Sequence, residues 1–421
     1  MIKLLIIADD FTGALDTGIQ FVKHGVKTKV LATPTYSIPN EKQQDTQVFV
    51  INAETRHLKA DQAYDVVFRV VQAAHQAGIP HIYIKTDSAL RGNVGSSLAA
   101  AMAGAQAEQI IFVPAFPQIG RCTRDGVHYI NDIPVHQSVF GQDLFEPVTC
   151  SDVREIIALQ SPVPVVLHPE NQPVNPHAQP GIQLYDACSE ARMQEIGDGL
   201  DEKQLHLSAG CAGFAAILLG LFGLEGAKQP LPELNPVLMV VCGSINPITT
   251  KQLEYAAEQG FHRLTLTAAQ KFTSRWGESA ECAQLLQNFY PGKNRLILDI
   301  NGPLETHSVE TAAFVKDLDV EQVRVMVATN LGSLVKQLLD QGFDGTLMLT
   351  GGDTLLGATK ALGVQELSPI GEIYQGVILS SFTYKEQTFH LISKSGGFGE
   401  KDILPKLAAF VAGTSQRQQG E

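Results

Sequence analysis

A strongly apolar pentapeptide ends at two consecutive aspartates, and this junction constrains the fold more than any other stretch of the chain. Leu4-Leu5-Ile6-Ile7-Ala8 has only apolar side chains, which predicts a strand buried on both faces of a parallel sheet. A helical pattern follows, so Asp9, Asp10, Thr12 and Gly13 are placed on a strand-to-helix turn at the edge where open α/β sheets bind ligands. Such a turn suits a base, a metal contact or a clamp for a hydroxyl group. The equally weighted alternative is that Asp10 or Thr12 caps the helix.

The alternation of strand and helix continues through the first half of the chain. Short apolar runs at 48–51, 81–84 and 110–113 end in polar turns, and helical patterns separate them. This order predicts an α/β fold, with a mostly parallel sheet that carries helices on both faces. Periodicity is lost at 125–147, which predicts a hairpin or a lid there.

The length of 421 residues indicates two domains. Gly226–Pro236 carries three prolines among polar residues and is predicted to be the linker. We therefore expect an N-terminal domain at 1–228 and a C-terminal domain at 237–415. The second domain repeats the α/β pattern, with a helix expected from about residue 330 to 341 and paired strands expected from 377 to 393.

Composition excludes several classes of partner. The net charge of −13 argues against a nucleic-acid or anionic-membrane surface, because phosphates are held largely by an excess of Lys and Arg. No apolar run approaches the ~20 residues of a membrane-spanning helix, and Met1 leads into the first strand without a signal-peptide pattern. We therefore expect a cytoplasmic protein.

The cysteines show no metal-binding pattern. They form no C-x-x-C pair and have no histidine at ligand spacing. We expect all of them to be reduced core or loop thiols, namely Cys122, Cys150, Cys188, Cys211, Cys242 and Cys282.

Two glycine-bearing loops in the second half suit an anion. Thr350-Gly351-Gly352-Asp353-Thr354 ends an apolar strand and opens a helix, so its backbone amides favour phosphate. Ser393-Lys394-Ser395-Gly396-Gly397-Phe398-Gly399 offers unhindered amides, two hydroxyls and a lysine, which is the composition of a phosphate nest. Each loop alone is better interpreted as a tight turn with a helix cap. Together they favour a nucleotide, although neither is a Walker or dinucleotide motif.

Cations follow strand ends beside the acids in the first half. Arg56, Lys85 and Arg91 each occupy such a position, and each alone is also explained as a solvated surface charge. Their co-occurrence with Asp9, Asp10 and Asp87 favours a hydroxylated substrate that bears a carboxylate.

The motifs together resemble those of the four-carbon acid sugar kinase family. The resemblance runs in order from residue 6 to residue 399. It rests on Ile7-Ala8-Asp9-Asp10-Phe11-Thr12-Gly13 with Asp16-Thr17-Gly18, on Lys85-Thr86-Asp87-Ser88 with Arg91-Gly92-Asn93, on Gly120-Arg121, and on the two glycine loops. The segment 120–127 is more similar to the threonate and erythronate kinases than to the 3-oxo-tetronate branch. Cys122 and Asn131-Asp132 depart from the family pattern, which leaves the exact acid open.

The resemblance implies an ATP- and Mg²⁺-dependent kinase that phosphorylates the terminal hydroxyl of an acid such as D-threonate, D-erythronate or 3-oxo-tetronate. It implies a sugar-acid-binding N-terminal domain, a nucleotide-binding C-terminal domain and an active site in the cleft between them. The expected substrate residues are Asp9, Asp10, Arg56, Lys85, Thr86, Asp87, Ser88 and Arg91. The expected ATP residues are Ser244, Thr350, Gly351, Gly352, Asp353, Lys394, Gly396, Gly397, Phe398 and Gly399. Asp10 and Asp353 are the catalytic candidates, and Asp353 is also the candidate metal contact, with helix capping as its alternative role.

Two rival functions remain. A dehydrogenase or lyase acting on the same acids is disfavoured because no dinucleotide fingerprint follows any strand. A non-catalytic sugar-acid-binding protein would need no phosphate loops. The assembly state is left open, with a homodimer as one alternative.

Overall fold

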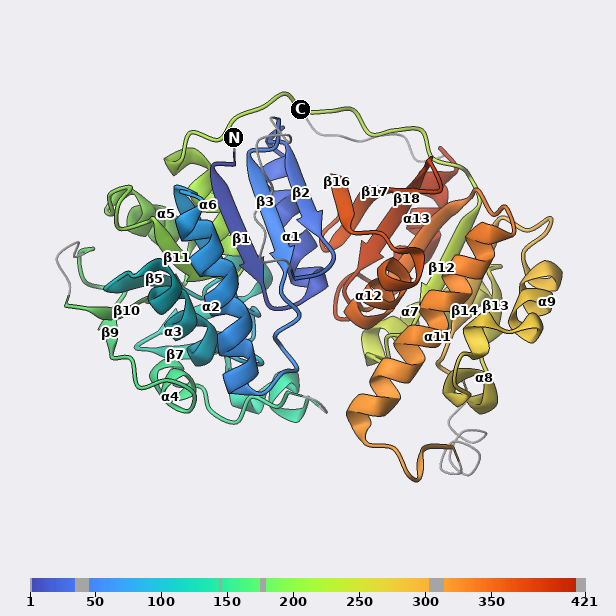
Figure 1. Ribbon diagram of the computed structural model, residues 1–421, viewed down its shortest axis with the longest axis horizontal. Helices are drawn as coiled ribbons and strands as arrows, with labels where there is room; N and C mark the ends of the chain where they lie inside the picture. Colours follow the sequence, from blue (N-terminus) through green and yellow to red (C-terminus); the bar gives the residue numbers. More distant parts are fainter. Residues whose placement is uncertain (1, 35–44, 144–145, 175–178, 303–313, 414–421) are drawn as a thin grey trace. The chain divides into compact units, whose positions relative to one another are not determined.

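The computed structural model describes residues 2–34, 45–143, 146–174, 179–302 and 314–413. The chain divides into two compact units, 1–229 and 230–421 (Figure 1). The boundary lies within the proline-bearing stretch Gly226–Pro236, which contains neither helix nor strand.

The sheet of the first unit is parallel throughout, and β1 (Leu4–Ala8) is one of its inner strands. Leu4 is opposite both Val48 of β3 (Val48–Asn52) and His81 of β4 (His81–Lys85). Since all three strands have five residues, they also end level with one another. The strands follow this order across the sheet: β2 (Thr28–Leu31), β3 (Val48–Asn52), β1 (Leu4–Ala8), β4 (His81–Lys85), β11 (Leu207–Gly210), β5 (Gln109–Val113), β10 (Gly181–Tyr185) and β9 (Val165–His168).

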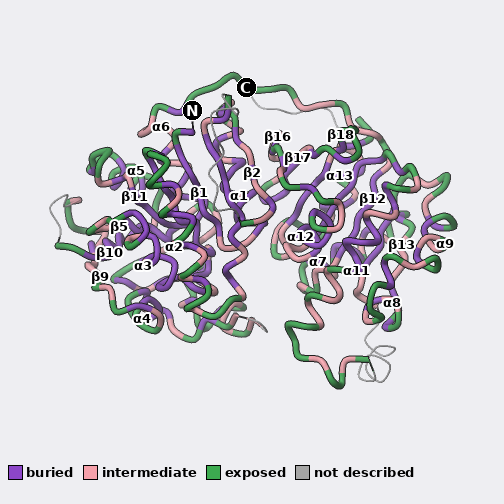
Figure 2. Tube along the Cα trace, in the orientation of Figure 1, coloured by how far each residue is buried: buried purple, intermediate pink, exposed green. Residues whose placement is uncertain are grey.

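Helices cover both faces of this sheet because its strands are apolar on both faces. All five residues of β1, β3 and β4 are buried. One face packs against α2 (Ala60–Gln76), α3 (Val94–Ala105) and α4 (Val153–Ala158). The remaining helices pack together as a second group: α1 (Phe11–Val22), α5 (Glu190–Asp198) and α6 (Ala212–Leu221). Figure 2 shows the strands as the most deeply buried part of the unit.

The predicted hairpin is present as a small antiparallel sheet. It contains β6 (Arg121–Arg124), β7 (Val127–Ile130) and β8 (Ile133–Pro134). The turn between β7 and β8 is formed by Asn131 and Asp132, both with positive φ, which Asn and Asp tolerate better than most residues. Short 3-10 turns follow the sheet, and the second of them, Val139–Gln142, carries Phe140.

The expectation that every cysteine is a reduced thiol is wrong for one pair. Cys122 of β6 and Cys188 form a disulfide, whereas Cys150, Cys211, Cys242 and Cys282 are free. An isolated backbone bridge between Thr123 and Ala187 brings the two segments side by side. The two cysteines are 66 positions apart, so only the tertiary fold could reveal this pairing.

The second unit contains a mixed sheet. Its strands follow this order: β13 (His262–Thr265), β14 (Arg295–Asp299), β12 (Leu238–Cys242), β15 (Thr346–Thr350), β18 (Gln387–Lys394), β17 (Val377–Tyr384) and β16 (Glu366–Tyr374). The first five are parallel, and the expected paired strands are an antiparallel addition formed by β16, β17 and β18. The predicted α/β class, with mostly parallel strands and helices on both faces, is confirmed.

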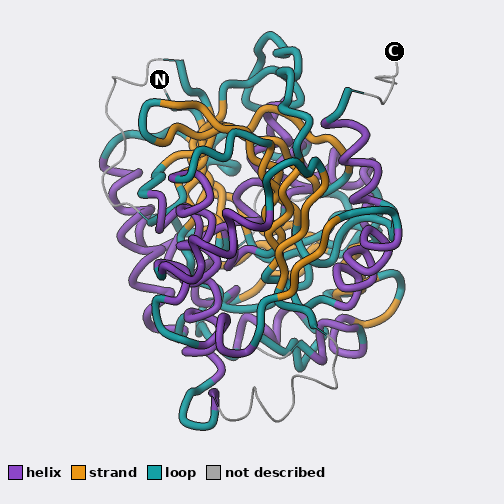
Figure 3. The backbone as a smooth tube through the Cα atoms, turned by 90° about the vertical axis from the view of Figure 1, so that its right-hand side faces the viewer, coloured by secondary structure: helices purple, strands orange, loops and turns teal. Residues whose placement is uncertain are grey.

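Helices cover this sheet in two groups. The core shared with the strands includes α7 (Pro247–Glu258) and α13 (Ile403–Val411). The other group packs around α11 (Val320–Asp340) and consists of α8 (Ala268–Phe272), α9 (Ala280–Phe289) and α12 (Gly352–Leu362). Figure 3 traces these helices and the strands along the backbone.

Helix α11 begins about ten residues before the predicted start. Asp319 caps it by accepting from the backbone N–H of Gln322, whose side chain in turn accepts from the Asp319 N–H. This reciprocal capping box fixes the first turn, most of which is exposed. No helix among the described residues is long and apolar enough to cross a membrane.

Helices α11 and α12 approach each other so closely that their backbones touch. A Cβ on Gly332 of α11 would overlap the carbonyl oxygen of Gly357, and a Cβ on Gly357 of α12 would overlap the carbonyl oxygen of Ala328. Only glycine fits at these two contacts. The crossing fixes α12, whose N-terminus carries one of the two glycine loops.

We predict that Gly357→Ala destabilises the second unit by about 1 to 3 kcal/mol, because the added methyl group forces the two helices apart. Gly220 of α6 is the matched control, since a Cβ there meets nothing within 4 Å. Gly220→Ala should leave stability unchanged or raise it slightly through helix propensity. Urea unfolding followed by circular dichroism measures both variants. Equal midpoints for Gly357→Ala and the wild type would contradict the prediction.

Candidate active site

The polar residues predicted for substrate binding gather at the carboxyl ends of β1, β3 and β4. Ala8 is opposite Asn52 of β3 and Lys85 of β4, so the residues that follow these strands start from the same level. The backbone N–H of Arg56 donates to the carbonyl of Asp9, and the N–H of Asp9 donates to the carbonyl of Lys85. The three strand ends are thereby tied together at one edge.

Arg56 is the centre of this cluster. Its Nε donates to Asp9 Oδ2 at 2.7 Å, its Nη1 donates to Asp10 Oδ2 at 2.7 Å, and its Nη2 lies 3.4 Å from Asp87 Oδ1. Arg56 is only 8% exposed. Burial alone would lower the pKa of Arg56, but Asp10 and Asp9 raise it well above its ordinary value. The guanidinium is therefore permanently charged and binds three carboxylates of the protein itself.

Asp10 is both the cap of α1 and a member of the cluster. Its Oδ1 accepts from the backbone N–H of Gly13 at 2.9 Å, and its Oδ2 accepts from the Thr12 hydroxyl at 2.8 Å. Burial would raise the pKa of Asp10, but Arg56 and Lys85 hold it below its ordinary value. The predicted capping role is confirmed, and the carboxylate remains ionised. Its catalytic role stays a prediction.

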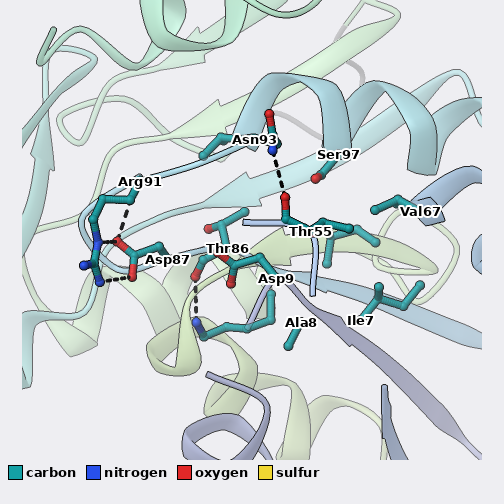
Figure 4. Close-up of a pocket in the computed structure, with 13 residues that line it drawn as sticks. Ile7, Ala8, Asp9, Thr55, Val67, Thr86, Asp87, Arg91, Asn93 and Ser97 are labelled. Atoms are coloured by element: carbon teal, nitrogen blue, oxygen red, sulfur yellow. Dashed lines mark hydrogen bonds and ion pairs between the residues drawn. The ribbon is translucent and has the colours of Figure 1, made fainter. Parts of the chain in front are cut away.

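Asp9 has a different environment although it is adjacent. Burial raises the pKa of Asp9 in spite of the nearby Arg56, and its Oδ1 is buried without a hydrogen-bond partner. Thr86 Oγ1 is also buried without a partner, and both residues line a cavity of about 10 Å³ (Figure 4). Such a cavity holds roughly one water molecule and is far too small for a four-carbon acid.

Lys85 and Asp87 complete the cluster. Lys85 Nζ donates to the Thr86 carbonyl at 2.7 Å, and a Cβ on Gly13 would lie only 3.0 Å from it, so glycine leaves room for the ammonium group above α1. Arg91 binds Asp87 with two N–H groups at 2.9 Å each (Figure 4). Burial opposes the charge of Asp87, yet Arg91 and Arg56 lower its pKa well below the ordinary value.

Ser88 connects the cluster to the hairpin through its backbone. Nε2 of His128 lies 2.9 Å from the Ser88 carbonyl, and Nδ1 of His128 lies 3.0 Å from the Thr123 hydroxyl. Burial lowers the pKa of His128 to about 4, so the ring is neutral at pH 7. Nε2 therefore carries the ring proton and donates the hydrogen bond to the Ser88 carbonyl. This bond holds the β6–β7 hairpin against the Lys85–Ser88 turn.

Sequence analysis missed three residues that surround Arg91. Asp143 Oδ2 accepts from Arg91 Nη1 at 3.0 Å. The ring of Phe140 lies under two guanidinium groups, with the Cζ atoms of Arg91 and Arg121 at 5.0 and 5.6 Å from its centroid. Gly120-Arg121 was part of the family resemblance but received no role. Nothing in the aperiodic sequence around Phe140 and Asp143 indicated that they fold back onto Arg91.

The predicted nucleotide residues converge at the carboxyl edge of the second sheet. A Cβ on Gly396 would overlap Oγ of Ser244, and a Cβ on Gly351 would lie 3.5 Å from the backbone nitrogen of Ser244. The N–H of Gly351 donates to the carbonyl of Lys394 at 3.1 Å. The turns after β12, β15 and β18 are therefore in contact, although they are distant in sequence. Thr350 itself is buried at the end of β15.

The loop formed by Gly396, Gly397, Phe398 and Gly399 is held from beneath. Lys394 is 1% exposed, and its Nζ donates to the carbonyls of Ser395 at 2.9 Å and Phe398 at 3.0 Å. Nε2 of Gln252 donates to the carbonyls of Phe398 and Gly399 at 3.0 and 2.7 Å. Burial lowers the pKa of Lys394 to about 8. Lys394 therefore contacts the loop backbone, and its contact with a nucleotide stays a prediction.

Helix α12 presents an uncapped N-terminus at the same edge. Gly351 is its N-cap with a φ of 101°, and no side chain accepts a hydrogen bond there. The amides of the first turn, Gly352 and Asp353 among them, therefore favour an anion. Asp353 does not cap the helix. Its half-exposed carboxylate is paired with Arg324 of α11.

The described residues contain no group of three or more His, Cys, Asp or Glu side chains that could hold a metal ion. Near Ser244, Asp299 is fully buried and bound by Arg263 at 2.7 and 3.0 Å. Asp353, in contrast, is half-exposed. Mg²⁺ commonly uses one or two carboxylates plus phosphate oxygens and water, so the donor set fits a metal that arrives with a nucleotide.

Two family models match the chain in sequence order. Residues 4–218 match a sugar-binding N-terminal domain, and residues 239–404 match a nucleotide-binding C-terminal domain. The matches separate the acid and cation cluster from the two glycine loops, as the geometry does.

Relatives align over almost the whole chain. A D-threonate kinase of Salmonella typhimurium is 29% identical, covering 97% of this chain and 98% of the relative. A D-erythronate kinase of Heliobacterium modesticaldum is 28% identical, with coverage of 96% and 95%. A 3-oxo-tetronate kinase of Pseudomonas savastanoi pv. phaseolicola is 25% identical, with coverage of 97% of each chain.

A solved structure supports the fold. A Salmonella typhimurium LT2 protein, provisionally described as a tRNA synthase, superimposes with a TM-score of 0.78 at 21% identity, covering 97% of this chain and 99% of that one. Because two domain models and full-length relatives agree with the motifs, the chain belongs to the four-carbon acid sugar kinase family.

Proposed function

We propose that this protein uses ATP to phosphorylate the terminal (4-) hydroxyl of a four-carbon sugar acid, with D-threonate and D-erythronate as the preferred candidates and 3-oxo-tetronate as the alternative. The observation that carries the proposal is the convergence of Ser244, Gly351 and Gly396 beside the uncapped N-terminus of α12. A sugar-acid-binding protein without catalysis has no use for such a phosphate site. The relatives named as kinases align across both units.

Asp10 is proposed to orient the acceptor hydroxyl. Its pKa is held below the ordinary value by Arg56 and Lys85 against the opposing effect of burial, so it accepts a hydrogen bond but is a weak base. This suits phosphoryl transfer, whose loose transition state depends on positioning and charge stabilisation more than on early deprotonation. Lys85, beside it, supplies positive charge where the incoming phosphoryl group would be transferred.

The second unit is proposed to hold the nucleotide. Amides of the Gly396–Gly399 loop and of the first turn of α12 would bind phosphate oxygens, and Ser244 would add a hydroxyl. Asp353 would leave its pair with Arg324 to contact Mg²⁺ directly or through water. When bound, the metal would neutralise charge on the transferred phosphoryl group.

The rival enzyme classes remain less supported. No glycine fingerprint for a dinucleotide follows any strand, which disfavours a dehydrogenase. An active site in the cleft between the domains, a homodimer and a cytoplasmic location stay predictions. A coupled ADP-release assay over D-threonate, D-erythronate, L-threonate and 3-oxo-tetronate tests the activity and identifies the acid.

We predict that Asp10→Asn lowers kcat on the order of a hundredfold or more while the Kd for ATP stays unchanged. Asparagine is an equally good helix cap, so the N-terminus of α1 should survive and the loss should reflect the missing carboxylate. Steady-state kinetics and ATP titration by calorimetry measure the two quantities. A variant with wild-type kcat would remove Asp10 from the mechanism.

We predict that Gly397→Val raises the KM for ATP by at least roughly tenfold, because its side chain would occupy the space that phosphate needs. The nearest atom to a Cβ at this position is Nδ2 of Asn246 at 3.9 Å, so the substitution is compatible with the fold. Binding of the sugar acid, measured by calorimetry, is the internal control and should not change. If the folded variant keeps its KM for ATP, the loop is a turn without a role in nucleotide binding.

A further inference from the structure

Arg121 is a cation at the candidate active site without an acidic partner among the described residues. Its Nη1 donates to the carbonyl of Ile119 at 2.6 Å, and its Nε is buried without a hydrogen-bond partner. It forms no ion pair with any residue that the structure describes. Burial lowers the pKa of Arg121, and the nearby Asp87 opposes this effect only in part. A buried Nε–H group without a hydrogen-bond partner is costly unless a ligand or a water molecule accepts from it.

The other cations of the site are already engaged. Every nitrogen of the Arg56 guanidinium faces Asp9, Asp10 or Asp87. Every nitrogen of the Arg91 guanidinium donates to a carboxylate, two of them to Asp87 and one to Asp143. A substrate carboxylate at either position would have to share the guanidinium with carboxylates of the protein.

Arg121 is also held at a fixed position. Its backbone N–H and carbonyl both form hydrogen bonds with Phe116, at 3.0 and 2.9 Å, and it is paired with Ile130 across the hairpin. The next residue, Cys122, is tied to Cys188 by the disulfide. The guanidinium groups of Arg121 and Arg91 both contact the Phe140 ring. Arg121 therefore lies beside Arg91, the residue that binds Asp87. A side chain supported in this way loses little conformational freedom when it binds a ligand.

We propose that Arg121 binds the carboxylate of the substrate side-on through Nε and Nη2, and that it is the residue that distinguishes a sugar acid from an uncharged sugar alcohol. The inference rests on the proposed function, because it assigns one end of the proposed substrate. Nε and Nη2 form the edge of the guanidinium that matches the two oxygens of a carboxylate. The proposal requires that, with the carboxylate at Arg121, the opposite end of the four-carbon chain reaches Asp10 and Lys85. Arg56, one of the expected substrate residues, would then serve the site by holding Asp9, Asp10 and Asp87.

The test compares Arg121→Gln with Arg121→Lys and uses Arg124→Gln as a matched control. Arg124 lies on the same hairpin strand, but its side chain is 53% exposed and only 3.7 Å from the exposed Asp132. Calorimetry measures binding of D-threonate, D-erythronate, 3-oxo-tetronate and the uncharged alcohol D-threitol to each full-length protein. Kinetics with ATP are measured in parallel.

We expect Arg121→Gln to weaken binding of the acid by roughly 10- to 100-fold, as befits a charge-assisted hydrogen-bond pair. Arg121→Lys should recover only part of this loss, because an ammonium group keeps the charge but lacks the planar fork. The KM for ATP and the weak binding of D-threitol should not change in either variant. Arg124→Gln should behave as the wild type.

An unchanged affinity of Arg121→Gln for every acid would overturn the assignment. A parallel loss for D-threitol, or a loss of ATP binding, would also overturn it, since either result means that Arg121 supports the fold of the site. The kinase proposal fails separately if the wild type binds an acid but transfers no phosphate to it, and the binding data still decide the role of Arg121. A wild type that binds none of the acids overturns both proposals.

Discussion

The first unit depends on one buried guanidinium that holds three carboxylates apart and in place. Asp9, Asp10 and Asp87 arrive from the ends of two strands, and without Arg56 their mutual repulsion at a buried edge would be severe. The two adjacent aspartates nevertheless differ, because burial raises the pKa of Asp9 in spite of Arg56, whereas Arg56 and Lys85 lower the pKa of Asp10 against the effect of burial. Because Arg56 balances its charge, Asp10 stays ionised and held in one orientation. A carboxylate in this state can accept a hydrogen bond from a substrate hydroxyl. Arg56 therefore allows three carboxylates to lie close together at a buried position.

Much of this arrangement could be predicted from the sequence because parallel strands impose it. An all-apolar strand that ends in acids, repeated by others that end in cations, must bring those polar groups to one edge once the strands align. In the second unit the turns that carry Ser244 and the two glycine loops also follow parallel strands and lie in contact, whereas Ser244 was expected at the site only from the family resemblance. The sequence pattern could not show which of these side chains form ion pairs with one another. Both Arg56 and Arg91 were expected to be available to a substrate, and only side-chain geometry shows that their N–H groups are engaged.

The residues that sequence analysis missed all depend on contacts between segments without periodic signals. Phe140 and Asp143 lie in 3-10 turns and irregular chain, and their proximity to Arg91 follows from the path of the hairpin. The Cys122–Cys188 pair depends on a single bridge between distant segments. Lys394 is a different case: its position was predicted, but a lysine in a glycine-rich loop suggested phosphate, whereas the buried ammonium group binds the carbonyls beneath the loop. The composition of a segment indicates what kind of ligand it could bind, but the folded structure decides which of its side chains point toward that ligand.

The close crossing of α11 and α12 has a consequence for motion. With no side chains between the two backbones at Gly332 and Gly357, neither helix can slide or tilt without the other, so the pair behaves as one rigid body. Asp353 and its partner Arg324 belong to this body, as does the helix N-terminus after Gly351. The Gly396–Gly399 loop is attached differently, through side-chain hydrogen bonds from Lys394, Gln252 and Thr249 to its backbone carbonyls. Entry and departure of a ligand at this edge would therefore be accommodated by changes in these side-chain contacts, while the pair of helices stays in place.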